Sequence, residues 1–123
     1  MKNANVRRIS LQNLPKAANY SHAVVANRII FVSGVTGQNE TKTTLKSQFD
    51  EIVRRISAVL SEGHSSIEDV VKVTAYLSDA GLFNEFNELF NKTFISAPAR
   101  TTIVCGFSNP RVKVELDLVA LES

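Results

Sequence analysis

Residues 112–121 read VKVELDLVAL, a stretch in which apolar residues occupy every second position. This period of two is typical of a β-strand with one buried face. The apolar face carries Val112, Val114, Leu116, Leu118 and Ala120, and the opposite face carries Lys113, Glu115 and Asp117. The stretch therefore predicts a sheet packed on a core, with Glu115 on the far side from that core.

A second strand is expected at residues 101–105, TTIVC. Ile103 and Cys105 lie on one face of this strand, while Arg100, Thr102 and Val104 lie on the other. Cys105 is expected on the helix-facing side, as a small core residue. If the apolar faces of both strands meet the same core, Arg100 and Glu115 project from the same far side of the sheet. A guanidinium and a carboxylate placed there can hold a small acid and move a proton.

Two helices and four further strands complete the predicted pattern. Apolar residues recur at helical spacing over residues 45–60 and 82–94, with Gly63 just past the first helix and Asp79 as a candidate N-cap for the second. The further strands are expected at 6–10, 22–26, 29–33 and 70–77, with Asn27-Arg28 as a two-residue hairpin turn between 22–26 and 29–33. In the strand at 70–77, we expect Val71, Val73, Ala75 and Leu77 to face the helices. This order predicts an α+β fold, with two helices on one face of a mixed sheet of about six strands. We expect residues 1–123 to form one domain.

Composition and charge argue against several classes of protein. A hydrophobic content of 44% and a formal charge of +2 are typical of a globular protein without a basic surface for nucleic acid. We find neither a signal peptide nor an apolar run long enough to span a membrane. The single cysteine suits a reducing compartment, so we expect a cytoplasmic protein. Two separated histidines and one cysteine make a poor metal site.

The face of the sheet away from the helices is expected to be partly apolar. The strand at residues 29–33 is apolar on both faces, and Val104, Val119 and Leu121 are expected to point away from the helices. Because two helices cannot cover both sides, a monomer would expose this patch, and such patches usually mark interfaces. We therefore expect the chain to oligomerise through its open face, which would bury Arg100 and Glu115 near a subunit boundary.

Short segments spread over nearly the whole chain carry a family resemblance. They are residues 19–24 (NYSHAV), Ser33-Gly34, residues 71–77 (VKVTAYL) with Asp79, Phe83 to Asn87, Pro98-Ala99-Arg100 and Val114-Glu115-Leu116. In this order and spacing the chain resembles the reactive intermediate deaminase family, also called the YjgF-type or endoribonuclease L-PSP family. The resemblance implies a chorismate-mutase-like fold, homotrimers with clefts between subunits, and chemistry that uses no metal or cofactor.

Many members of that family hydrolyse 2-imino acids or their enamine tautomers, such as 2-iminobutanoate and 2-iminopropanoate, to 2-keto acids and ammonia. By resemblance, Arg100 binds the substrate carboxylate and Glu115 activates the attacking water. The other substrate-binding positions that the resemblance implies are Tyr20 (reaching in from a neighbouring subunit), Gly34, Thr102 and Asn87. Val35 stands where glutamine is frequent in the family, and Thr102 where cysteine is frequent; Val35 bears on the choice of substrate.

Other functions stay open at the level of the sequence. The same trimeric scaffold can serve as a keto-acid-binding regulatory module without turnover. It can also act as a pathway deaminase or hydrolase on a related acid, such as an aminoacrylate or an aminomuconate. A nuclease or translation inhibitor is a third class, against which the lack of a basic groove and of a histidine pair argues.

Overall fold

The computed structural model describes residues 5–123 and contains six strands and two α-helices. The strands are β1 (Val6–Ile9), β2 (Ala23–Ala26), β3 (Ile29–Thr36), β4 (Val70–Leu77), β5 (Ala99–Val104) and β6 (Val114–Leu121). They form one mixed sheet in the order β1-β2-β3-β6-β4-β5. All neighbouring strands are antiparallel except β4 and β5, which are parallel. The predicted α+β fold with a six-stranded mixed sheet is confirmed.

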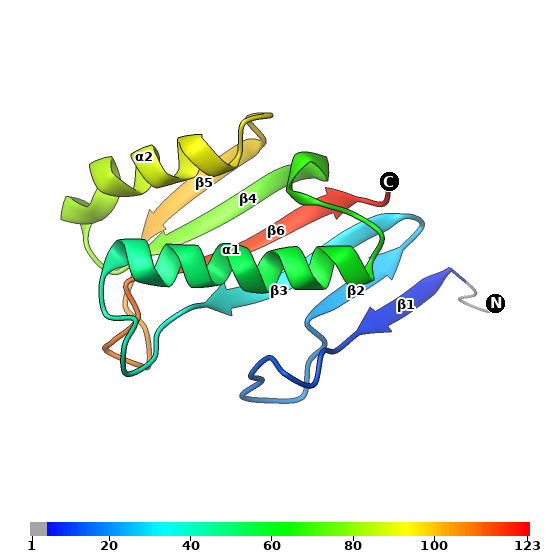
Figure 1. Ribbon diagram of the computed structural model, residues 1–123, viewed down its shortest axis with the longest axis horizontal. Helices are drawn as coiled ribbons and strands as arrows, with labels where there is room; N and C mark the ends of the chain where they lie inside the picture. Colours follow the sequence, from blue (N-terminus) through cyan, green and yellow to red (C-terminus); the bar gives the residue numbers. More distant parts are fainter. Residues whose placement is uncertain (1–4) are drawn as a thin grey trace.

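Both helices lie on the same face of the sheet, α1 (Leu45–Glu62) over its centre and α2 (Phe83–Thr93) over the β4–β5 side (Figure 1). Thr44 caps α1 through a reciprocal pair of bonds with Ser47, and Gly63 ends the helix as predicted. Asp79, in contrast, does not cap α2. Its side chain accepts the N–H of Gly81 and caps the short 3₁₀ turn Ala80–Leu82 that leads into α2. Another 3₁₀ turn, Ile67–Asp69, precedes β4.

The core fills the space between the helices and the sheet. Phe49, Ile52 and Ile56 of α1 and Phe86 of α2 are fully buried against the sheet. The predicted inner face of β6 is confirmed, because its alternate residues from Val114 to Ala120 are all buried. Residues of this size contribute roughly 1.5–3 kcal/mol each when they leave water, so this layer dominates the stability of the fold.

The hairpin between β2 and β3 turns at Asn27 and Arg28, as the sequence predicts. Both residues have positive φ, 52° and 67°. That is the geometry of a type I′ turn, in which asparagine at the first position is favoured and an arginine at the second is strained relative to glycine. The tight turn sets the register of β2 and β3, and β3 then continues beyond Ser33 to Thr36, further than predicted.

Strand β4 departs from its predicted faces at its first residues. A register shift between Val70 and Lys72 lets Val70 turn inward, while Val71 is 43% exposed. The prediction that Val71 faces the helices is therefore wrong. The irregular pairing inserts one extra residue into the strand. Alternation counted back from Leu77 therefore assigns Val70 and Val71 to the wrong faces. Val73, Ala75 and Leu77, beyond the shift, face the helices as predicted.

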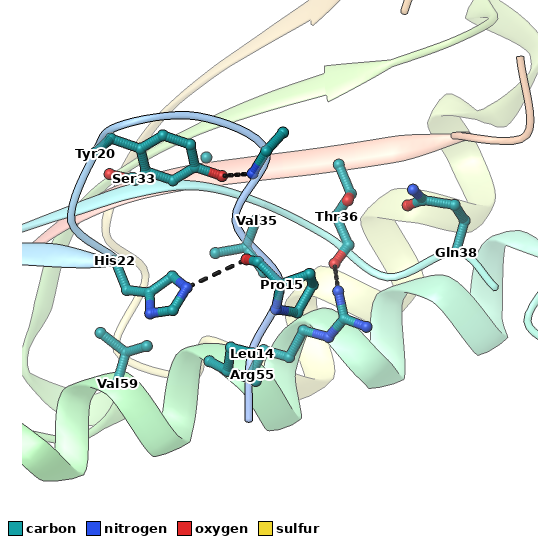
Figure 2. Close-up of a pocket in the computed structure, with 12 residues that line it drawn as sticks. Leu14, Pro15, Tyr20, His22, Ser33, Val35, Thr36, Gln38, Arg55 and Val59 are labelled. Carbon is teal, nitrogen blue, oxygen red and sulfur yellow. Dashed lines mark hydrogen bonds between the residues drawn. The ribbon is translucent and has the colours of Figure 1, made fainter. Parts of the chain in front are cut away.

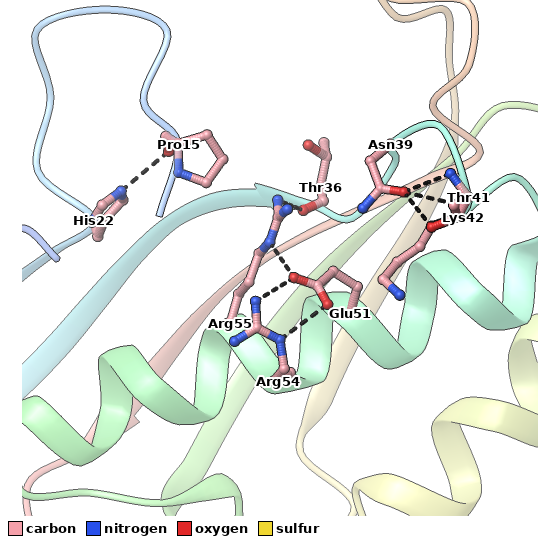
Figure 3. Close-up of polar contacts among 9 residues, drawn as sticks. All are labelled: Pro15, His22, Thr36, Asn39, Thr41, Lys42, Glu51, Arg54 and Arg55. Carbon is pink, nitrogen blue, oxygen red and sulfur yellow. Dashed lines mark hydrogen bonds and ion pairs between the residues drawn. The ribbon is translucent and has the colours of Figure 1, made fainter. Parts of the chain in front are cut away.

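Polar side chains of α1 fix the two strand ends that meet at the candidate site. Gln48 is fully buried; its amide donates to the carbonyls of Lys42 and Arg111 and accepts the N–H of Lys113. Arg55 donates to the carbonyl of Thr36 at the end of β3, at 2.7 Å (Figure 3). These bonds tie the start of β6 and the end of β3 to the helix. Over residues 5–123, neither helix is long and apolar enough to cross a membrane.

Candidate active site

Glu115 lies in the middle of the sheet, on the face without helices. In the strand pairing it stands opposite Thr36 of β3 and Tyr76 of β4. Its neighbours in the chain, Val114 and Leu116, are completely buried on the helix side. The predicted face of Glu115 is confirmed, and its side chain is half-buried among those of the neighbouring strands.

Gly34 gives the Glu115 carboxyl group its space. A Cβ atom at position 34 would collide with Glu115 Oε2, so a larger residue here would displace the carboxyl group. The surrounding residues form a shallow cleft lined by Tyr20, Val32, Ser33, Gly34, Glu115 and Asp117. Three of the predicted site residues, Tyr20, Gly34 and Glu115, are thus brought together within one chain.

His22 holds the loop that carries Tyr20. The N–H of Leu11 donates to His22 Nδ1 at 2.9 Å, and His22 Nε2 lies 3.2 Å from the carbonyl oxygen of Pro15 (Figure 2). Because the backbone donates to Nδ1, this arrangement requires a neutral ring with its proton on Nε2. Tyr20 and Glu115 thus line the same cleft within one chain.

The environment of Glu115 disfavours the ionised form of its carboxyl group. Burial, and to a smaller extent the nearby charge of Asp117, raise the pKa of the Glu115 carboxyl group. Tyr76 donates to Asp117 at 2.7 Å, and this bond together with burial raises the pKa of the Tyr76 phenol to about 12. The phenol thus stays protonated, and Glu115 is the group of this cleft whose pKa is moved toward the range useful for a general base.

Arg100 lies on an aromatic surface of α2. Its guanidinium carbon lies 4.8 Å from the ring centre of Phe90, 5.3 Å from that of Phe86 and 5.9 Å from that of Phe83. Nη2 donates to Asn87 Oδ1 at 2.7 Å, so two predicted site residues are in direct contact. Burial lowers the pKa of the guanidinium, which nevertheless stays charged. The cation–π interaction between a guanidinium and an aromatic ring is favourable by about 0.5–2 kcal/mol, and it is strongest where water is excluded.

Arg100 and Glu115 lie on opposite faces of the sheet, so the prediction that they share a face is wrong. In the parallel pairing of β4 and β5, Arg100 stands beside Val73 and Thr102 beside Ala75. Val73 and Ala75 are fully buried under the helices. Arg100 and Thr102 therefore point to the helix side.

The error comes from treating the apolar residues of β5 as its inner face. Ile103 is 41% exposed and stands beside Tyr76 on the open face. Cys105, expected in the core, is only half-buried and lies near Tyr76 as well. Val104, expected on the open face, pairs with Leu77 on the helix side and is exposed at the strand end. When an edge strand carries its apolar residues on an uncovered face, the alternation of its sequence assigns the two faces the wrong way round.

The structure also adds two residues that the sequence prediction did not place in the site. Ser33 lines the cleft, and its hydroxyl donates to the carbonyl of Ser21 at 2.6 Å. Asp117 lines the same cleft and acts on the charge of Glu115. Asp117 was detectable in the sequence, because two residues along a strand return to the same face. Among the described residues, no group of three His, Cys, Asp or Glu side chains could hold a metal ion.

Comparisons with known proteins agree with this fold. The family described as endoribonuclease L-PSP matches residues 11–122. Protein HMF1 of Saccharomyces cerevisiae is 34% identical over 111 residues, which cover 86% of either chain. Reactive Intermediate Deaminase A of Arabidopsis thaliana, a chloroplastic protein, is 29% identical over 119 residues, which cover 91% of this chain and 64% of that protein.

Among solved structures, yeast Mmf1 superposes with a TM-score of 0.87 at 27% identity, covering 96% of this chain and 99% of the other. The agreement therefore extends over the strands and helices that carry both Glu115 and Arg100. The chain belongs to the endoribonuclease L-PSP family, whose members include YjgF- and RidA-type proteins.

Proposed function

We propose that the chain hydrolyses 2-imino acids to 2-keto acids and ammonia, in clefts formed between copies of the chain in a homotrimer. Arg100 is the observation that carries this proposal. Its guanidinium is held against three rings, and no carboxylate within residues 5–123 forms an ion pair with it. A partly desolvated cation without an anion is costly, and a substrate carboxylate would supply the missing partner.

Thr102 supports the proposal that a ligand binds at Arg100. Its hydroxyl oxygen is buried without a hydrogen-bond partner, two residues beyond Arg100 on the same face of β5. A buried hydroxyl that bonds to nothing costs about 1–3 kcal/mol. A ligand bound to Arg100 would present polar atoms close to this position.

Glu115 supplies the chemical step in this proposal. The carboxylate takes a proton from a water molecule as the water oxygen bonds to the imine carbon and the C=N π electrons move to the nitrogen. The carboxyl group then passes that proton to the nitrogen, which restores the carboxylate. In the resulting carbinolamine, transfer of the hydroxyl proton to nitrogen allows the C–N bond to break, which releases ammonia and the 2-keto acid. A carboxyl group with a raised pKa can accept and return a proton at neutral pH.

Two copies of the chain are needed to place both groups on one substrate. Within one copy, Arg100 and Glu115 lie on opposite faces of the sheet. Arg100 belongs to the edge strand β5, whereas Glu115 lies on the central strand β6. An edge of one copy laid on the open face of the next brings the groups together, and repetition of such a head-to-tail contact closes a ring.

The open face has the composition of an interface. Phe31 of β3 and Leu121 of β6 are 48% and 46% exposed there, and Ile103 of β5 is 41% exposed on the same face. Large apolar side chains gathered on one face of a sheet usually mark a site of association. A homotrimer, the assembly implied by the family resemblance, would cover this surface and form one cleft at each contact.

Complementation between two inactive variants tests this arrangement. Arg100→Ala removes the carboxylate anchor and Glu115→Gln removes the base, so either variant alone should lose imine hydrolysis. Co-refolded in equal amounts, the two should recover about one quarter of the parent activity, because a random ring pairs an intact Arg100 with an intact Glu115 at one contact in four. The assay follows ammonia released from an imine that an amino acid oxidase generates in place.

Each alternative gives a different result in this experiment. If both groups acted within one copy, no mixture would regain activity. If the chain were a regulatory module, the parent would bind pyruvate in calorimetry but would not accelerate ammonia release. Full activity of Glu115→Gln alone would contradict the assigned base.

A further inference from the structure

A second cavity, of about 300 Å³, lies at the free edge of β3. Strand β2 pairs with β3 only as far as Val32, so the last residues of β3 have no strand partner on that side. The loop with Leu14 and Pro15 lines the cavity there, and α1 contributes Arg55 and Val59 (Figure 2). The volume is at the lower end of the range for small-molecule pockets. A compact ligand therefore fits this cavity.

Gln38 brings an unused hydrogen-bond acceptor to the cavity. Its side chain is part of the lining, and its Oε1 atom is buried without a hydrogen-bond partner. Within residues 5–123, the Thr102 hydroxyl on β5 is the other buried side-chain atom in this condition. Buried polar groups of native proteins are nearly always bonded to the protein, to water or to a ligand, because leaving them unpaired is costly. Gln38 therefore calls for a molecule that donates a hydrogen bond.

Arg55 brings unused donors to the same end of the cavity as Thr36 and Gln38 (Figure 2). Its side chain is only 13% exposed, and it donates from Nε to Glu51 and from Nη1 to the carbonyl of Thr36. No residue from 5 to 123 accepts a bond from Nη2, so the two N–H groups of that nitrogen are available. Glu51 is shared with Arg54, so one carboxylate faces two guanidinium groups. The surplus positive charge favours an oxygen atom of the ligand at Nη2.

The free groups of the lining distinguish between classes of ligand. His22 and Ser33, which also line the cavity, are already bonded to backbone groups. Gln38 and Arg55 thus offer one free acceptor and one free donor. A carboxylate fits this pair poorly, because its oxygens would lie against Gln38 Oε1 and would add a second negative charge to that of Glu51. A neutral amide fits better, since it carries a donor and an acceptor side by side.

We propose that this cavity binds a small neutral molecule with an amide edge, whose N–H donates to Gln38 Oε1 and whose carbonyl oxygen accepts from Arg55 Nη2. Lactams, primary amides and ureas present this edge. Water can satisfy either protein group singly, and a ligand that satisfies both replaces the water without losing hydrogen bonds. The site is separate from the proposed reaction and does not depend on it.

A pair of lactams tests the proposal on the parent protein. Pyrrolidin-2-one holds its N–H and its C=O on one edge, whereas N-methylpyrrolidin-2-one keeps the carbonyl and lacks the donor. Titrations followed by proton–nitrogen correlation spectra should give a dissociation constant of about 1 mM for pyrrolidin-2-one, as expected for a ligand of so few atoms. The signals of the Gln38 amide and of Arg55 Nε–H should shift. The N-methyl compound should bind at least about tenfold more weakly, because it leaves Gln38 Oε1 unpaired.

Protein variants make the same comparison from the other side of the contact. Gln38→Leu removes the acceptor and should weaken the binding of pyrrolidin-2-one at least about tenfold. Gln12→Leu is the matched control, since Gln12 is an exposed loop residue that does not line the cavity, and it should leave the affinity within about twofold. If Gln38→Leu does not fold, the comparison of the two lactams on the parent decides.

Three results would overturn the proposal. Equal binding of both lactams to the parent would show that Gln38 accepts no hydrogen bond from the ligand. Tighter binding of propanoate than of pyrrolidin-2-one would show an anion site, with the Gln38 amide turned over to donate. Absence of binding by every probe would show that water alone satisfies Gln38 and Arg55. None of these results bears on imine hydrolysis, which the complementation experiment tests separately.

Discussion

Arg100 combines a permanent charge with a planar shape, and its surroundings use both properties. The rings of Phe86 and Phe90 stack against the guanidinium, while Asn87 fixes one edge of its fork. A lysine at this position would keep the charge but would lose the stacking and the two-pronged contact with a carboxylate. The geometry of the group, as well as its charge, is therefore part of the site.

Substituting Arg100 by lysine should impair binding and turnover together. We expect a loss of at least tenfold in kcat/KM, about 1.4 kcal/mol of transition-state stabilisation, because the carboxylate would be held by one point charge instead of a fork. Kinetics with an oxidase-generated imine and calorimetry with pyruvate measure the two effects. Arg54→Lys, an exposed arginine on α1, is the control. Parent-like behaviour of Arg100→Lys would reduce Arg100 to a structural residue.

Asp117 should set the acidic limit of activity through Glu115. The negative charge of Asp117 contributes to the raised pKa of Glu115. The base works in its ionised form, so activity falls as the pH drops through that pKa. Asp117→Asn removes the charge and can still accept the bond from Tyr76, so the acidic limb of the pH profile of kcat/KM should move to lower pH. Asp50→Asn, at an exposed position of α1, should leave the limb in place.

The sequence predicts the individual residues of the site better than their arrangement. The face of Glu115 follows from the alternation of one regular central strand, and Gly34 follows from a family motif. The same alternation could have placed Asp117 beside Glu115, although the prediction did not include it. The face of Arg100 could not be derived, because β5 carries its apolar residues on the uncovered side of the sheet. The cavity lined by Leu14, Gly34 and Val35 could not be predicted from the sequence either, because it depends on where β2 stops pairing with β3.

Helix α1 connects the scaffold to the site through one buried carboxylate. Glu51 bonds to Arg54 and Arg55, and Arg55 in turn holds the carbonyl of Thr36 (Figure 3). The hydrogen bond from Arg54 is the main cause that lowers the pKa of Glu51 from 4.5 to about 2, with Arg55 adding to the effect. The ionised form of Glu51 is thus favoured by folding.

The contribution of Glu51 to stability should disappear in acid. Because the pKa of Glu51 is lowered in the folded state, its stabilisation is complete above pH 4.5 and is lost as the pH falls toward 2. Urea denaturation should therefore show Glu51→Gln to be less stable than the parent at pH 7, by a margin that shrinks at pH 3. Glu62→Gln, at the exposed end of the same helix, provides the comparison. A margin independent of pH would mean that packing, not charge, explains the effect.

For the whole molecule, the proposed closed ring would both cover the open sheet face and bring Arg100 of one copy to Glu115 of another. An interface between copies would bury Phe31 and Leu121, and it would bring the edge strand of one copy to the cleft of another. The apolar face was anticipated from the strand at residues 29–33, which has no polar side. The proposed role of this face in the site follows only from the strand order, which places Arg100 on an edge strand and Glu115 on a central one.

Light scattering at micromolar concentration should give the mass of three chains. Phe31→Glu places a charge in the centre of the apolar face, so it should yield monomers that no longer hydrolyse imines. Circular dichroism should confirm that the variant remains folded, because Phe31 makes no part of the helix-facing core. Ser57→Glu, on the exposed side of α1, should remain trimeric and active. A parent protein that is monomeric and active would exclude a shared cleft.

The two tyrosines give the cleft an optical signal of its own. The chain has no tryptophan, and its tyrosines are Tyr20, which lines the Glu115 cleft, and Tyr76, which stands opposite Glu115 in the sheet. Ultraviolet emission excited beyond the absorption of phenylalanine therefore arises from one tyrosine in this cleft and one that is bonded to its Asp117. Ligand entry, subunit mixing and the ionisation of Glu115 can all be followed in real time by fluorescence of the unlabelled protein.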